Sequence, residues 1–118
     1  MSYITINKKF FFENLNHVVK PLGNKKKICL VIKDNAYGHG INEISSLAKE
    51  YGIENVYVKS DDEAEIVAKY NFNSIIILNS IKKHSKKNVS FVINSLDDLK
   101  LSQKNSNIEL KINTGLNR

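Results

Sequence analysis

Short apolar runs alternate with helix-patterned segments along most of this sequence, and no other feature constrains the possible folds as strongly. Five runs rich in aliphatic residues are predicted to be strands: 28–32, 53–58, 74–78, 89–93 and 108–112. Four segments with apolar residues at helical spacing are predicted to be helices: 8–20, 41–51, 61–68 and 96–101. The first strand is an unbroken apolar run, which is typical of a strand covered on both faces.

The order of these elements predicts an α/β fold with a parallel sheet. Strands that alternate with helices pair in parallel through right-handed crossover connections. Five strands fit an open doubly wound sheet, and they also fit part of a (β/α)8 barrel, which needs eight strands and about 250 residues. The pattern alone leaves both architectures open. The sequence has no glycine-rich phosphate loop of the G-x-G-x-x-G type to favour a dinucleotide-binding sheet.

The chain of 118 residues carries a formal charge of +6, which raises the question of nucleic-acid binding. Its basic clusters lie in predicted loops, without interleaved aromatic residues or a recognisable nucleic-acid-binding motif: Lys25–Lys27, Lys82–His84 and Lys86–Lys87. We therefore predict no nucleic-acid partner. The sequence also has no run of about 18 apolar residues, so no membrane partner is predicted.

The start of the chain and its single cysteine bear on compartment and chemistry. Residues 1–7 lack a basic patch followed by an apolar core, so we predict no secretory signal and a cytoplasmic location. Cys29 lies inside the first apolar run, where a buried structural thiol is expected rather than a catalytic one. No two histidines have the spacing of metal ligands on a helix, and no metal is predicted.

Lys33 stands directly after the apolar strand 28–32, and its position points to chemistry. Ligands and catalytic groups lie at the carboxyl ends of the strands in parallel β/α folds. A lysine amine in such a place can form a Schiff base with a carbonyl compound. Gly38 and Gly40 allow a tight turn, and Tyr37 offers a hydroxyl to a ligand phosphate. By burial pattern alone, a lysine extending from the strand end into water is the more ordinary explanation.

A resemblance to a known family overturns that explanation. Residues 32–40 read Ile-Lys-Asp-Asn-Ala-Tyr-Gly-His-Gly and resemble the signature of bacterial alanine racemases, V-K-A-N-A-Y-G-H-G. The six consecutive residues from Asn35 to Gly40 match that signature. Asp34 stands where alanine is usual.

Two further segments carry the same resemblance. Residues 110–118 resemble the family pattern L-K-x-D-T-G-M-x-R, with Asn113 in place of aspartate and Leu116 in place of methionine. Residues 58–64 more weakly resemble a strand-to-helix turn that ends in an acidic residue followed by Glu-Ala. The likeness covers essentially the whole chain, and about the first third of a full-length racemase.

The resemblance implies an alanine racemase that uses pyridoxal 5'-phosphate, with alanine as the small-molecule partner. Lys33 is then the catalytic residue, which holds the cofactor as an internal aldimine and moves the α-proton on one face of the substrate. Tyr37 would bind the cofactor phosphate. Arg118 would bind both the cofactor, near its phenolic oxygen, and the substrate carboxylate. Lys111 would be a supporting residue, carbamylated in many members, that orients this arginine. His39 is expected to be a packed turn residue.

The resemblance also implies an architecture and a partner. Members of the family are homodimers in which an eight-stranded barrel precedes a β-rich domain, and a tyrosine from the partner's C-terminal domain serves the second face of the substrate. Residues 1–7 are then expected to form a short strand, Tyr3–Ile6, that packs on such a domain. Residues 8–118 are expected to form the N-terminal part of the cofactor-binding (β/α)8 TIM-type barrel, with about five of its eight parallel strands.

Three functional hypotheses follow for the chain itself. It is a fragment of a bacterial alanine racemase that supplies D-alanine for peptidoglycan, or a truncated product without activity, and the coding DNA beyond residue 118 would distinguish these two. The alternative is a non-catalytic barrel that holds pyridoxal phosphate, of the cofactor-homeostasis type. Unpaired strand edges promote association. We therefore expect the isolated chain to be poorly stable and inactive as a racemase.

Overall fold

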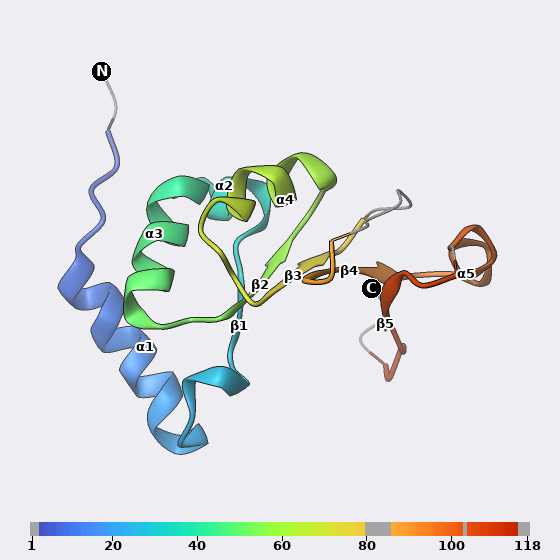
Figure 1. Cartoon of the computed structure of the whole chain (residues 1–118). Coiled ribbons are helices and arrows are strands. Elements are labelled where there is room, and N and C mark those ends of the chain that lie inside the picture. Colours follow the sequence, from blue (N-terminus) through green and yellow to red (C-terminus); the bar gives the residue numbers. More distant parts are fainter. Residues whose placement is uncertain (1–2, 80–85, 103, 116–118) are drawn as a thin grey trace.

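The computed structural model shows a five-stranded parallel sheet with helices packed against it (Figure 1), and it describes residues 3–79, 86–102 and 104–115. The strands are β1 (Cys29–Val31), β2 (Asn55–Val58), β3 (Ser74–Ile77), β4 (Val89–Ile93) and β5 (Asn107–Leu110). The helices are α1 (Lys8–Leu22), α2 (Lys33–Tyr37), α3 (Ile41–Tyr51), α4 (Asp61–Ala68) and α5 (Leu96–Leu101), with a short 3-10 helix, η1 (Lys25–Lys27). The five strands predicted from the apolar runs and all four predicted helices are confirmed. The pattern did not predict α2 or η1.

The strand order distinguishes the two architectures that the sequence left open. The strands lie in the order β1-β2-β3-β4-β5, and each neighbouring pair is parallel. A doubly wound sheet reverses its strand order at a switch point, whereas a barrel adds each new strand to the same growing edge. The sequential order of the described strands therefore identifies part of a (β/α) barrel of the TIM type.

The hydrophobic core lies between the sheet and helices α3 and α4. Val56 of β2 and Ile75 of β3 are almost fully buried, and they belong to one cluster with Ala48 of α3 and Val67 of α4. Figure 1 shows α1 and α3 side by side, next to the β1 end of the sheet. The burial predicted for both faces of β1 is wrong, because Val31 remains 40% exposed. β1 is an edge strand, and its second face has no covering layer among the described residues.

The ends of α1 follow the local signals in its sequence. Asn7 caps the start, since its side-chain oxygen accepts a hydrogen bond from Phe10 N at 3.1 Å. Gly23 ends the helix in a left-handed conformation, and its N–H donates to Val19 O at 2.9 Å. Pro21 lies in the last turn of α1, which ends at Leu22, two residues beyond the predicted end at residue 20.

Two features outside the core bear on the sequence expectations. The short strand expected at Tyr3–Ile6 is not present, since residues 3–7 precede α1 without belonging to any strand. The packing of residues 1–7 on a further domain stays a prediction. Cys29 is half-buried, and burial first, then the charge of Glu109, raises the pKa of its thiol to about 12. A thiol that stays protonated at neutral pH is a poor nucleophile, which favours the structural role.

Candidate functional site

All five strands contribute to one cavity at their carboxyl ends. The cavity has a volume of about 400 Å³, within the range of small-molecule sites. Its lining residues lie at or just after the ends of β1 to β5: Lys33, Lys59, Leu78, Asn79, Val92, Asn94 and Lys111. Three ammonium groups and two amides thus surround one space. Such a donor set suits an anionic ligand, and a lysine amine adds the possibility of a bond to a carbonyl carbon.

The chain leaves β1 through an unusual backbone turn. The four residues from Asp34 to Tyr37 have φ between 52° and 56°, so this part of α2 is a left-handed turn, although none of them is glycine. Left-handed helical backbone costs about 1–2 kcal/mol per residue in L-amino acids, which makes several kcal/mol for the four. Strain of this kind persists where the surrounding structure fixes the backbone, and such places are often functional sites. Here it immediately follows Lys33.

Hydrogen bonds within residues 32–41 hold this turn. Ala36 N donates to Ile32 O at 3.0 Å, and Gly40 N donates to Asn35 O at 3.0 Å. The Asn35 side-chain oxygen accepts from Ile41 N at 2.9 Å, which joins the turn to the first residue of α3. Gly40 itself has φ of 99°, a conformation that side chains rarely adopt, and a Cβ there would collide with Glu43. The predicted tight turn is therefore present, in a left-handed form.

Glu63 connects the left-handed turn to the neighbouring strand. One carboxylate oxygen accepts from Asn35 N at 3.0 Å, and the other accepts from Lys59 N at 2.7 Å. Ser60 caps α4, with Glu63 N 3.4 Å from its hydroxyl oxygen. The sequence Ser-x-x-Glu at a helix start is the pattern of a capping box. Here the glutamate also reaches the turn after β1.

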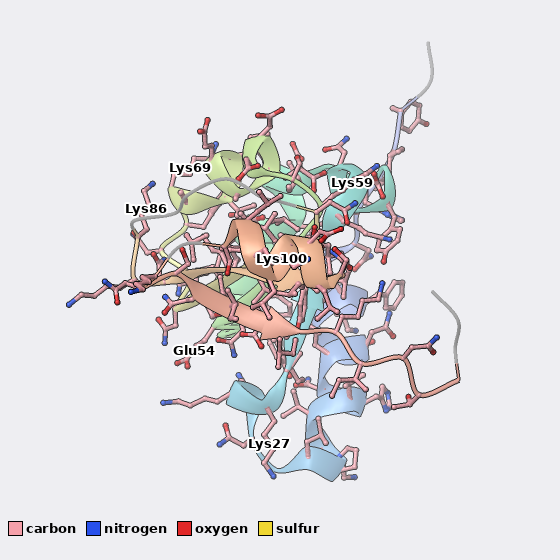
Figure 2. All side chains as sticks on the ribbon, turned by 90° about the vertical axis from the view of Figure 1, so that its right-hand side faces the viewer. Lys27, Glu54, Lys59, Lys69, Lys86 and Lys100 are labelled. Carbon is pink, nitrogen blue, oxygen red and sulfur yellow. The ribbon has the colours of Figure 1, made fainter. Side chains whose placement is uncertain are left out.

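A lysine–aspartate pair makes a second connection between the same two turns. Lys59 Nζ lies 2.5 Å from Asp34 Oδ1, and both side chains are about half exposed. The hydrogen bond to Asp34, followed by the charge of Asp34, raises the pKa of Lys59 above its ordinary value. Figure 2 places Lys59 at the opposite end of the molecule from Lys27 of η1. Lys59 thus keeps its charge at the cavity wall.

The predicted site residues lie in these positions. Lys33 is half-buried, and its Nζ lies 5.9 Å from the centre of the Tyr37 ring. Tyr37 is 59% exposed and is not among the residues that line the cavity, so its predicted contact with a phosphate stays a prediction. Lys111 lines the same cavity from β5, with Nζ 3.4 Å from the Asn94 side-chain oxygen. Arg118 lies outside the described residues, as does Leu116, and the arginine's predicted roles stay predictions.

His39 and Asn113 take part in local contacts. The His39 ring nitrogen Nδ1 lies 2.9 Å from Ala36 O, and because a carbonyl only accepts, this nitrogen carries the proton. The imidazole thus holds the left-handed turn, but His39 is exposed and not packed against its neighbours as the sequence predicted. The Asn113 side chain accepts a hydrogen bond from Gly115 N at 3.0 Å.

The sequence analysis missed four residues of the site: Lys59, Glu63, Asn79 and Asn94. Three of them could have been found by the rule that selected Lys33. Lys59, Asn79 and Asn94 follow their strands directly or within two residues, and the carboxyl ends of parallel strands meet at one edge. Glu63 had its capping pattern and the weak family resemblance of residues 58–64, and neither gives information about a neighbouring turn.

The described residues contain neither a candidate metal site nor a helix that could cross a membrane. No group of three or more His, Cys, Asp or Glu side chains in 3–79, 86–102 and 104–115 is placed to hold a metal ion. None of the helices in that part of the chain is long and apolar enough to cross a membrane. In Figure 2, Lys27, Lys59 and Lys100 lie at separate places on the molecule, and Lys69 and Lys86 lie near each other on one side of the view.

Sequence comparisons relate nearly the whole chain to one family. The profile described as "Alanine racemase, N-terminal domain" matches residues 6–118. An alanine racemase of Campylobacter jejuni (strain 81-176) is 38% identical over all of this chain, and one of Campylobacter concisus is 39% identical. The chain covers 36% and 35% of these two relatives, so it spans about a third of their length.

Comparison of structures gives the same result. The crystal structure of the Oenococcus oeni alanine racemase matches with a TM-score of 0.75 and 29% identity, over 94% of this chain and 34% of the other. The histidine racemase of Leuconostoc mesenteroides matches with a TM-score of 0.65 over 80% of this chain and 27% of its own. At 20% identity, this second likeness concerns the fold alone.

Proposed function

The chain belongs to the alanine racemase N-terminal domain family, and from this premise we propose that it provides the cofactor lysine of a pyridoxal-phosphate-dependent alanine racemase. One observation carries the proposal. The lysine of the family signature, Lys33, lies at a cavity to which all five strand ends contribute. The complete racemase activity is a property of the longer relatives, and this chain spans about a third of their length.

The donor set of the cavity fits the proposed cofactor. Pyridoxal phosphate has an aldehyde and a phosphate dianion, and the cavity has a primary amine at Lys33 with the ammonium groups of Lys59 and Lys111 around it. Asn79 and Asn94 add neutral donors and acceptors. When bound, the cofactor supplies an electron sink that acidifies the α-proton of an amino acid.

Each residue of the chain has a defined task in this proposal. Lys33 would hold the cofactor through its Nζ and, when its amine is free, would accept or donate the α-proton on one face of the substrate. Tyr37 would donate a hydrogen bond from its hydroxyl group to a phosphate oxygen. Lys111 orients Arg118, whose fork of N–H donors binds the substrate carboxylate. Carbamylation of Lys111 would replace its ammonium by a carboxylate-like group and reverse its charge.

Family membership supports the remaining parts of the proposal. We place the activity in the cytoplasm, in a homodimer that supplies D-alanine for the bacterial cell wall. The second face of the substrate then needs a group from outside this chain, because proton transfer on both faces of a planar carbanion requires two bases. We accordingly expect the isolated chain to bind the cofactor without racemising alanine.

The test is covalent trapping on the chain. Borohydride reduction of the chain with pyridoxal phosphate, followed by peptide mapping, is expected to place the adduct on Lys33 and to show its loss in Lys33→Ala. Lys27→Ala is the matched control, since Lys27 lies at the far end of the molecule (Figure 2) and should not affect the yield. Equal labelling of all exposed lysines would contradict the proposal. Alpha-proton exchange of alanine in D2O then separates a catalytic role from simple cofactor binding.

A further inference from the structure

The inference concerns Glu63, and it rests on the proposed function of Lys33. In the left-handed turn after β1, the backbone donor Asn35 N is satisfied from outside the turn. Ala36 N bonds back to Ile32 O, within the turn, whereas Asn35 N donates to Glu63 Oε1 at 3.0 Å. This bond is exposed to solvent, so its value lies in geometry: it fixes the position of a backbone group in the strained turn from outside the turn. A side chain from α4 supplies the acceptor.

The carboxylate of Glu63 is fixed from two sides. Its Oε2 accepts from Lys59 N, at the end of β2, while its Oε1 accepts from Asn35 N, just after β1. Both bonds are charge-assisted, and such bonds are stronger than those between neutral groups. The capping contact at Ser60 places the backbone of Glu63 at the start of α4. Glu63 therefore sets the distance between two adjacent strand ends at the cavity.

A second acidic residue shows that a hydrogen bond to a neighbouring strand-to-helix turn is not a general property of the helix starts in this fold. Asp98 occupies the same place in α5, three residues after the cap Ser95, and it accepts from Asn94 N at 2.9 Å. That bond runs to its own strand end, as the bond from Glu63 to Lys59 does. Glu63 makes the additional bond to the turn that carries Lys33.

We propose that Glu63 is a positioning residue, which holds the turn after β1 so that the Lys33 amine faces the cavity. Glu63 does not line the cavity, so it acts through the backbone of Asn35 and Lys59 rather than on the ligand. Glutamine has the same size but one acceptor oxygen fewer. It can serve one of the two N–H donors and must turn its own NH2 toward the other.

The first measurement is the rate at which pyridoxal phosphate and cyanoborohydride label Lys33, relative to Lys27 in the same molecule. Glu63→Gln is expected to lower this ratio roughly tenfold, the factor that corresponds to one lost charge-assisted hydrogen bond. Glu63→Ala should lower it further. Asp97→Asn is the control, because it removes one negative charge from the first turn of α5, where Asp97 pairs with Lys100, and touches no residue of the cavity; it should leave the ratio unchanged. An unchanged ratio in Glu63→Gln would overturn the proposal.

The second measurement keeps this inference separate from the proposed function. Amide hydrogen exchange of Asn35 and Lys59, followed by NMR without cofactor, should accelerate in Glu63→Gln while the far-UV circular dichroism of the chain stays the same. If wild-type Lys33 is labelled no faster than Lys27, the proposed function fails, and the exchange data alone decide the positioning role. Unaltered exchange at Asn35 in Glu63→Gln would then overturn it.

Discussion

Two strand-to-helix units of this sheet, β2–α4 and β4–α5, start their helices with the same local contacts. In each, a serine caps the helix, and the acidic residue three positions later accepts a hydrogen bond from the N–H just after the strand. The two helices then differ in burial. α4 buries Ala64 and Val67, whereas α5 buries no residue, and Leu96, Leu99 and Leu101 remain exposed.

The difference shows which part of a helix is encoded locally. A serine and a nearby carboxylate satisfy the first N–H groups of a helix wherever they occur. Burial depends on the neighbours, and α4 packs beside α3 and on β3. α5 lies at the far end of the sheet, beside β4 and the exposed edge strand β5 (Figure 1). Matching substitutions in the two units should therefore destabilise their own helices equally, but they should change the free energy of unfolding of the whole chain by different amounts.

The largest contrast is expected in the packing of the two helices. Val67→Ala removes two methyl groups from a fully buried site and should lower the free energy of unfolding by about 2 kcal/mol. Leu99→Ala removes more atoms from a side chain that is 42% exposed, and it should cost less than about 1 kcal/mol. Urea unfolding followed by circular dichroism measures both. Equal costs would mean that α5 is as well packed as α4.

A smaller contrast is expected at the caps. Ser60→Ala and Ser95→Ala each remove a side-chain acceptor at a helix start, which typically costs about 1 kcal/mol of helix stability. Ser60→Ala should lower the urea midpoint of the whole chain, because α4 belongs to the core. Ser95→Ala should accelerate amide exchange in α5 and hardly move that midpoint. A shift of the midpoint as large as that of Ser60→Ala would show that α5 unfolds together with the sheet.

The smallest effect is expected at the Asp34–Lys59 pair, the exposed connection of the β2–α4 unit to the turn after β1. Asp34 raises the pKa of Lys59 above its ordinary value of 10.5, so the pair stabilises the fold below that pH and loses this contribution as the pH rises through the folded-state pKa. Asp34→Asn, which keeps a side chain suited to the left-handed backbone at this position, should therefore lower the pKa of Lys59, measured by NMR of its Cε, and leave the urea midpoint at pH 7 nearly unchanged. An unaltered Lys59 titration would exclude the bond.

Most of the fold and part of the site could be predicted from the sequence. Apolar periodicity predicted each strand and the four longer helices, because burial on a sheet or a helix repeats at a fixed spacing. The left-handed turn from Asp34 to Tyr37 had no such signal. Its residues gain this conformation from hydrogen bonds to Ile32, Ile41 and Glu63, and the last of these comes from another strand-to-helix unit.

The sequence by itself determined the local elements, their caps and the lysine of the family signature, since each depends on residues only a few positions apart. Only the tertiary structure decided that the strands follow one another without reversal, that α4 is buried and α5 exposed, and that Lys33, Lys59 and Lys111 share one cavity. These outcomes depend on which elements become neighbours in space. The physical reason is that the free energy of burial and of charge pairing arises between segments distant in the chain, where sequence spacing carries no information about distance.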